Sequence, residues 1–232
     1  MNVLLEFDEL VHIAISMLAI SIAFTLVFAG PEGLLRAPTQ FFLFALMSMA
    51  TVGSGFVLHE MGHKLTAIYF GGQSKFRMWP QGLLFMLVVS LFGVLFAAPG
   101  AVYIYLNKIT KKQNGLISIA GPAINLLLVG FFLLLAWLYP IRMYFPFIPD
   151  ANGLVNVWYF GAQMNLLLAL FNMIPAFPLD GSKVWDWSKL VWGGTTAGLL
   201  AMQALIFSPM LVISWLLMFA LVFIASKLLF RR

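Results

Sequence analysis

FVLHEMGHKL, residues Phe56–Leu65, places two histidines and a glutamate in one of the most apolar parts of the chain. On a helix, His59 and His63 lie one turn apart on the same face, where two imidazoles can bind one zinc ion. Glu60 cannot easily join the same tetrahedron, but it can reach a zinc-bound water. This H-E-x-x-H pattern predicts a helical metal site at which the glutamate activates water for attack on an amide.

The chain around this stretch is too apolar for a soluble domain. Of its 232 residues, 62% are hydrophobic and 9% are charged, whereas a soluble domain has about 25% charged residues. An integral membrane protein in the lipid bilayer is therefore predicted. The net charge of +5 then reports on topology, and no nucleic-acid partner is expected because no basic run is interleaved with exposed aromatics. The absence of cysteine excludes disulfides and thiolate metal ligands.

Ionisable residues inside a membrane are functional by default, because each costs about 2.5 kcal/mol or more at the bilayer centre. This cost favours the metal site. A buried structural histidine pair with a glutamate, or a proton relay, is the alternative interpretation of HEMGH.

The apolar runs predict an all-α integral membrane protein with about six transmembrane helices. A span needs about 20 mainly apolar residues. The candidate runs are residues 9–29, 39–70, 116–139, 153–178 and 191–228. The last run is interrupted by Ser208-Pro209 and is long enough for two short spans. The first run is expected to be retained, because its acidic start is unlike a signal peptide.

Residues 82–106 are apolar but predict a short strand-rich or re-entrant membrane-associated segment. Their β-branched, aromatic, Gly and Pro content is typical of a strand or re-entrant chain. Basic loops at Gln73–Arg77 and Asn107–Lys112 flank the segment, and such loops favour the cytoplasmic side. The segment must then enter and return. Six spans with both termini cytoplasmic follow, in a multi-pass protein assigned to the cell membrane.

A zinc ion bound by two histidines needs a third protein ligand if water is to hold the fourth position. His12, the remaining histidine, fits packing on the first helix better. Asn172–Gly181, NMIPAFPLDG, ends the run 153–178 with two prolines and places Asp180 in the same leaflet as HEMGH. From the spacing alone, a plain helix-capping role for Asp180 stays equally open.

HEMGH followed by N-x-x-P-x-x-P-L-D-G resembles the site-2 protease family of intramembrane zinc metalloproteases, peptidase family M50. The resemblance implies that His59, His63 and Asp180 bind one Zn²⁺ ion. It assigns the activation of water to Glu60. GPAINLLL is similar to the G-P-x-x-N element of the family, which would direct Asn125 toward the oxyanion of the substrate carbonyl.

The resemblance covers residues about 40–190 and implies one polytopic membrane catalytic domain over residues 1–232. The PDZ and CBS domains of other members have no room here, so a minimal catalytic core is expected. A strand-rich segment follows the HExxH helix in the family, which agrees with the prediction for residues 82–106.

The implied reaction hydrolyses a peptide bond within or near a transmembrane segment of a membrane protein, as in regulated intramembrane proteolysis. Glu60 would take a proton from water and return it to the leaving amine. A strand edge within 82–106 would hold the substrate extended by strand addition. The alternative for that segment is a packed hairpin that only fills the bundle.

A catalytically inactive or transport-type membrane metal-binding protein is the alternative function. The presence of Glu60 and the lack of internal repeats argue against it. Gln163 and Asn165 are expected to bond neighbouring helices, while Asn172 gains weight as part of the second motif. The sequence does not indicate the oligomeric state.

Overall fold

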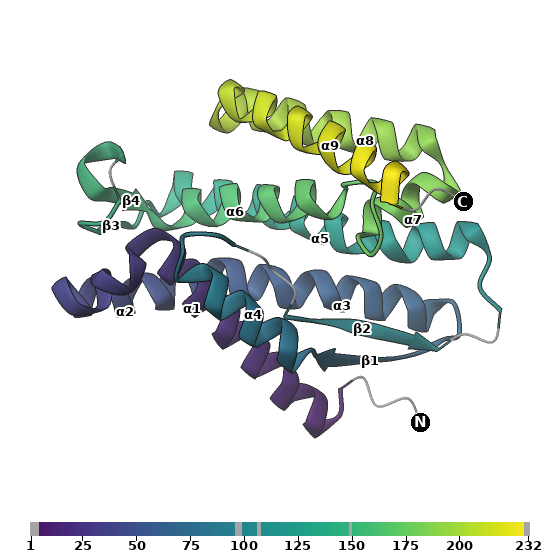
Figure 1. The fold of residues 1–232 in the computed structure, drawn as a ribbon, viewed down its shortest axis with the longest axis horizontal. Coiled ribbons are helices and arrows are strands. Elements are labelled where there is room, and N and C mark those ends of the chain that lie inside the picture. Colours follow the sequence, from purple (N-terminus) through teal and green to yellow (C-terminus); the bar gives the residue numbers. More distant parts are fainter. Residues whose placement is uncertain (1–4, 96–98, 106–107, 149, 230–232) are drawn as a thin grey trace.

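The computed structural model describes residues 5–95, 99–105, 108–148 and 150–229, and it is mostly helical (Figure 1). Its α-helices are α1 Phe7–Arg36, α2 Pro38–Ser48, α3 Ser54–Tyr69, α4 Pro80–Ser90, α5 Lys111–Leu138, α6 Val157–Asn172, α7 Asp180–Trp187, α8 Lys189–Met202 and α9 Pro209–Leu229. Two π-helices, η1 Met49–Gly53 and η3 Gln203–Phe207, and one 3₁₀ turn, η2 Asp150–Gly153, interrupt or join them. The strands are β1 Gln73–Met78, β2 Gly100–Tyr105, β3 Arg142–Tyr144 and β4 Leu154–Asn156.

Four helical runs within the described residues are long and apolar enough to cross a membrane. They are Phe7–Arg36, Pro38–Tyr69, Lys111–Leu138 and Lys189–Phe207. They agree with the predicted runs 9–29, 39–70 and 116–139 and with the first half of 191–228. The helix α6 has 16 residues and the described apolar part of α9 ends at Val222, so both are shorter. The count of six spans stays a prediction.

The second of these runs carries the H-E-x-x-H stretch. It begins with Pro38 at its first position, where a missing N–H costs nothing, and continues through α2, η1 and α3. It ends at Tyr69 with Phe70 as its C-cap, and Gly71 follows with φ 81, a conformation that glycine adopts without strain. The HEMGH residues therefore lie well inside a long apolar helix.

The segment 82–106 is part helix and part strand. The helix α4 starts with Pro80 at its first position and continues through a Leu- and Met-rich run, so the expectation of strand there was wrong. The strand β2 is present and pairs antiparallel with β1, with Gln73 opposite Tyr105 and Met78 opposite Gly100. The chain therefore leaves and returns at the same place (Figure 1). Residues 96–98 and 106–107 lie outside the described part, and the re-entrant position in a membrane stays a prediction.

A buried ion pair fastens α1 to the helix that bears the histidines. Lys64 Nζ lies 2.5 Å from Glu9 Oε1, and their side chains are 2% and 1% exposed. The same carboxylate oxygen accepts a hydrogen bond from the backbone N–H of Phe76 on β1, at 2.8 Å. Removing one partner of a buried pair costs about 3–5 kcal/mol, so this contact fixes α1, α3 and β1 together. Two more exposed pairs extend the junction, Glu6 with Lys75 and Asp8 with Arg77.

The helices α5 and α6 pack against α3 and η1 and place the second motif. The helix α6 ends at Asn172, six residues earlier than the predicted run. Irregular chain with the two prolines of the second motif leads from there to Asp180, the first residue of α7. The β3–β4 hairpin joins α5 to α6 at the opposite end of these helices (Figure 1).

Candidate metal centre

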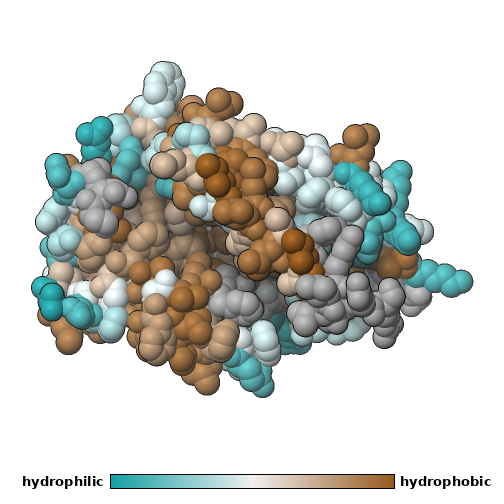
Figure 2. Space-filling view, turned by 45° about the horizontal axis from the view of Figure 1, so that its top comes forward, coloured by the Kyte–Doolittle hydropathy of each residue, from teal (hydrophilic) through white to brown (hydrophobic). Residues whose placement is uncertain are grey.

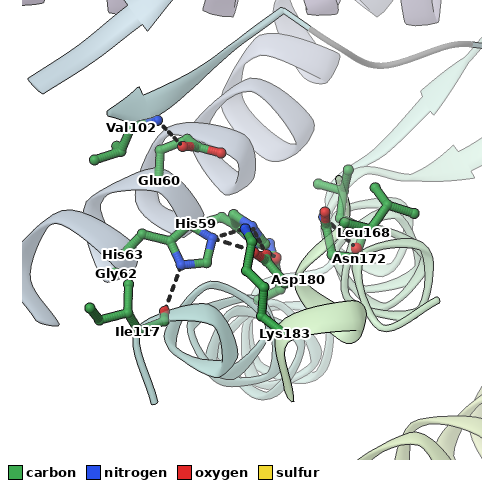
Figure 3. A network of polar contacts seen from close by, with 12 residues as sticks. His59, Glu60, Gly62, His63, Val102, Ile117, Leu168, Asn172, Asp180 and Lys183 are labelled. Atoms are coloured by element: carbon green, nitrogen blue, oxygen red, sulfur yellow. Dashed lines mark hydrogen bonds and ion pairs between the residues drawn. The ribbon is translucent and has the colours of Figure 1, made fainter. Parts of the chain in front are cut away.

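Three buried side chains bring one ligand atom each to a common point (Figure 3). The Nε2 atoms of His59 and His63 are 3.0 Å apart. Asp180 Oδ2 lies 3.3 Å from the first and 3.0 Å from the second. The two histidines come from α3 and the aspartate from the start of α7. Across the described ranges, this is the one group of at least three His, Cys, Asp or Glu residues close enough to hold a metal ion.

The hydrogen bonds behind the two rings leave their Nε2 atoms free to bind a cation. His63 Nδ1 lies 2.7 Å from the carbonyl oxygen of Ile117, which can only accept, so the proton is on Nδ1. His59 Nδ1 lies 2.6 Å from Asn125 Oδ1 and is assigned the same tautomer. In neutral rings both Nε2 lone pairs then converge with the Asp180 carboxylate, and three acceptors so close together are stabilised by a cation between them. Zinc in a tetrahedral site holds its ligand atoms about 3.3 Å apart, so the three residues fit one zinc ion.

Two glycines of the motifs let α5 approach the histidine face of α3. A Cβ on Gly121 would lie 2.5 Å from His59 Nε2 and 2.6 Å from His63 Cε1. A Cβ on Gly62, between the histidines, would lie 3.0 Å from the carbonyl oxygen of Ala120. A Cβ on Gly121 would displace the histidine rings, and one on Gly62 would require the facing backbone of α5 to shift by a few tenths of an ångström.

The carboxylate of Glu60 is oriented by the backbone of β2. The N–H of Val102 donates to Glu60 Oε2 at 2.9 Å, and the glutamate is 8% exposed (Figure 3). Glu60 adds no atom to the group formed by the histidines and Asp180. The predicted base therefore lies beside the candidate metal centre and next to an edge strand.

Asp180 points one oxygen at the histidine rings and the other at a lysine. Its Oδ1 lies 3.4 Å from Lys183 Nζ, one turn later on α7. The N-cap of α7 is Leu179, so Asp180 is inside the first turn and not at the capping position. Gly181 follows because a Cβ there would overlap the Met173 carbonyl. This tight contact sets how α7 leaves the irregular chain.

The group faces a cavity of about 540 Å³ whose walls come from both motifs and from β2. Residues 99–104 line one side of it, and Asn172 and residues 176–180 line another. Figure 2 shows that hydrophobic residues gather in the middle of one face of the molecule, with hydrophilic residues mainly toward its two ends.

The remaining predicted residues lie in different surroundings. His12 is half-buried on α1, outside the metal-binding group, and in the described part of the chain its Nδ1 has no hydrogen-bond partner. Asn172 lines the cavity and donates to the Leu168 carbonyl at 3.0 Å (Figure 3).

Asn125 is fully buried behind His59, and its Nδ2 faces Asn165 Oδ1 and the Gly55 carbonyl. The oxyanion role of Asn125 stays a prediction, and both hydrogens of its amide are engaged elsewhere.

The sequence predicts that Asn165 bonds a neighbouring helix. It does so, and the bond leads to Asn125 and from there to His59. An asparagine within the apolar run 153–178 indicates a polar contact between helices. Its partner on another helix cannot be predicted from the spacing of residues along the sequence.

Comparisons with known proteins agree with the motifs. The sequence profile of peptidase family M50 matches residues 139–197, which contain the second motif and not HEMGH. A protein of Methanocaldococcus jannaschii named "Putative zinc metalloprotease MJ0611" is 36% identical over 185 residues, 79% of this chain and 86% of that protein. A Bacillus subtilis protein named "Putative zinc metalloprotease YwhC" is 33% identical over 143 residues, 56% of this chain and 63% of its own length. A second M. jannaschii protein, "Zinc metalloprotease MJ0392", is 30% identical over 129 residues, 55% of this chain but only 30% of its own length.

The chain therefore belongs to peptidase family M50, and the resemblance to the site-2 proteases that its motifs indicated is confirmed. The family match indicates a peptidase, and the long apolar helices indicate that it is integrated in a membrane.

Proposed function

We propose that this protein is an intramembrane zinc metalloprotease that hydrolyses a peptide bond within or near a transmembrane segment of a membrane protein. The observation that carries the proposal is the buried group of His59, His63 and Asp180, two of whose members lie inside a helical run apolar enough to span a membrane. The names of the relatives support zinc as the metal, and the geometry suits one ion.

A zinc ion bound by these three residues would supply a Lewis acid for the scissile carbonyl and for water. The remaining chemistry belongs to the chain. Glu60 accepts the Val102 N–H through one oxygen, and its second oxygen, which makes no hydrogen bond to the described residues, would take a proton from the attacking water. The same carboxyl group then returns the proton to the leaving amine.

The edge of β2 that faces away from β1 supports the substrate-binding part of the proposal. Phe76 and Val102 are opposite each other, and their N–H groups bond outward to Glu9 and Glu60. Phe76 and Val102 therefore form a non-hydrogen-bonded pair of the antiparallel ladder. The backbone N–H and C=O groups of Val102, and of Ile104 two residues later, point away from β1. Because β2 lines the cavity, an unwound substrate can add along this edge beside Glu60.

Removal of the metal is expected to abolish cleavage. The purified protein is incubated in detergent with a single-span membrane protein, and the products are mapped by mass spectrometry. A zinc chelator should stop cleavage, zinc should restore it, and the non-chelating isomer of the same compound should have no effect. Cleavage that survives the chelator contradicts the metal mechanism. Cleavage confined to soluble tails, far from the span, contradicts the intramembrane site.

We also propose a single catalytic domain over residues 1–232, in the cell membrane, with both termini cytoplasmic. The pairing of Gln73 with Tyr105 supports a segment that enters and returns, because it brings both flanking basic loops to one place. The last residues of the basic C-terminal tail, 230–232, lie outside the part of the chain that the structure describes.

Labelling of single cysteines checks this topology, since the chain has no native cysteine. In intact cells, cysteines at the exposed positions Gln73 and Ile109 should be shielded from an impermeant external reagent, and one at Tyr144 should react. Reaction at only one of Gln73 and Ile109 would refute the returning segment. Reaction at both, with Tyr144 shielded, would keep the returning segment but reverse the orientation.

A further inference from the structure

A chain of buried side-chain amides runs from η1 to the ring of His59. Asn165 Nδ2 lies 2.9 Å from the carbonyl oxygen of Gly161 and 3.2 Å from that of Thr51. Asn165 Oδ1 lies 2.9 Å from Asn125 Nδ2, and Asn125 Oδ1 lies 2.6 Å from His59 Nδ1. This series of hydrogen bonds starts at η1, passes through α6 and α5, and ends on α3. Its last member is the ring of His59, which also carries the proposed metal ligand Nε2.

The directions of these hydrogen bonds can be followed from the far end, and the Gly55 carbonyl, 3.3 Å from Asn125 Nδ2, favours the same orientation of the second amide. Backbone carbonyls can only accept, so the nitrogen of the Asn165 amide must face Thr51 and Gly161. Its oxygen must then face Asn125, which has to present its nitrogen there. The oxygen of Asn125 is left for His59, and an oxygen acceptor requires the proton on Nδ1.

The surroundings leave the two amides little freedom. Asn125 and Asn165 are both fully buried, where an unpaired amide is costly. Gly55 faces Asn165, and a Cβ there would overlap the oxygen of its amide. The carbonyl of Thr51 belongs to a π-helix, an element often found at functional sites.

We propose that Asn165 is a positioning residue that fixes the tautomer of His59 by orienting Asn125. The proposal rests on the zinc-binding role proposed above for His59. With the Asn125 amide reversed, its nitrogen would face the ring, and the proton would move to His59 Nε2. That proton would then point at Asp180 and His63, and the atom needed by the metal would be blocked.

The tautomer can be read directly, because the chain has three histidines. Protein labelled with ¹⁵N-histidine and stripped of metal gives three ring signals, which the variants His12→Gln and His63→Gln assign. In the wild type we expect His59 protonated on Nδ1. In Asn165→Leu we expect a partial shift to the Nε2-protonated form, because the shorter contact of Asn125 Nδ2, at 2.9 Å, is lost and only the Gly55 carbonyl at 3.3 Å still favours the original orientation. Gln163→Leu on the same helix is the matched control, because residues two apart face different directions, and it should leave the signal unchanged.

Zinc affinity, measured by competition with a coloured chelator, gives a second readout. Asn165→Leu should weaken zinc binding by about 10–100-fold, as expected for the loss of a partner behind a ligand. The double variant Asn125→Asp with Asn165→Leu should regain most of this affinity, because a carboxylate offers His59 an acceptor in either orientation. A merely structural role of Asn165 predicts no such rescue.

The outcomes separate this inference from the proposed function. A wild-type His59 that carries its proton on Nε2 overturns the inference even if no variant folds. Gly55→Ala, which displaces the Asn165 amide and keeps both asparagines, is the second variant if Asn165→Leu does not fold, and it should give the same shift. Unchanged tautomer and unchanged zinc affinity in the variants overturn the inference while zinc binding stands. A wild type that binds no zinc overturns the proposed function, whereas the tautomer result stands on its own.

Discussion

Replacement of Glu60 with glutamine is expected to slow hydrolysis by about 10²- to 10⁴-fold and to leave zinc binding unchanged. The amide has the same shape, and its oxygen can still accept the Val102 N–H that holds Glu60 Oε2. It cannot accept a proton from water at neutral pH, however. Because Glu60 adds no atom to the group of His59, His63 and Asp180, the metal should remain.

Bound zinc and turnover, measured on the same preparation, test these two roles separately. Glu32→Gln is the matched control, because Glu32 is an exposed glutamate paired with Arg36 far from the cavity. Near-normal turnover in Glu60→Gln would show that Glu60 is not the base. Loss of zinc in Glu60→Gln would show that the glutamate is a ligand.

Replacement of Asp180 with asparagine is expected to weaken zinc binding by more than about 100-fold. Loss of a hydrogen-bond partner behind a metal ligand costs about 10–100-fold in affinity, and the loss of a charged ligand should cost more. The amide oxygen is neutral and a poorer ligand, and the amide nitrogen can donate to the bare Nε2 of His59 or His63, which lie 3.3 and 3.0 Å from Oδ2. Turnover should fall in parallel, because the group then lacks its negative member.

A role of Asp180 limited to the first turn of α7, without a metal, makes a different prediction. It requires only an acceptor oxygen, so Asp180→Asn should then cost about 1 kcal/mol of stability or less and keep its zinc. Thermal unfolding in the presence of chelator measures the stability without the metal. Asp186→Asn on the exposed face of α7 is the control for a charge lost from the same helix. Full zinc retention in Asp180→Asn would remove this residue from the proposed ligand set.

The sequence could predict those parts of the centre that depend on local geometry. The separation of His59 and His63 by four residues sufficed to place their rings together, because a helix repeats at that distance. The approach of Asp180 to them depends on how α7 packs, and only the family motif could indicate it.

Long-range polar contacts could not be predicted in the same way. Glu9 bonds to Lys64 and Asn165 to Asn125, yet neither residue carries any local sign of its partner. The segment 82–106 was predicted only in part, for another reason. Its strand-forming residues are concentrated in the second half, whereas Pro80 just before the segment and the leucines of its first half favour the helix α4.

The buried pair of Glu9 and Lys64 has a consequence for how this kind of protein can vary. The motifs lie within residues about 40–190, but the lysine that follows His63 is neutralised from α1, outside that range. An isolated chain that starts after α1 would hold an uncompensated cation one residue from a proposed metal ligand. We therefore expect the first helix and the charge at position 64 to be inherited together, so that relatives lacking a counterpart of α1 carry an uncharged residue there.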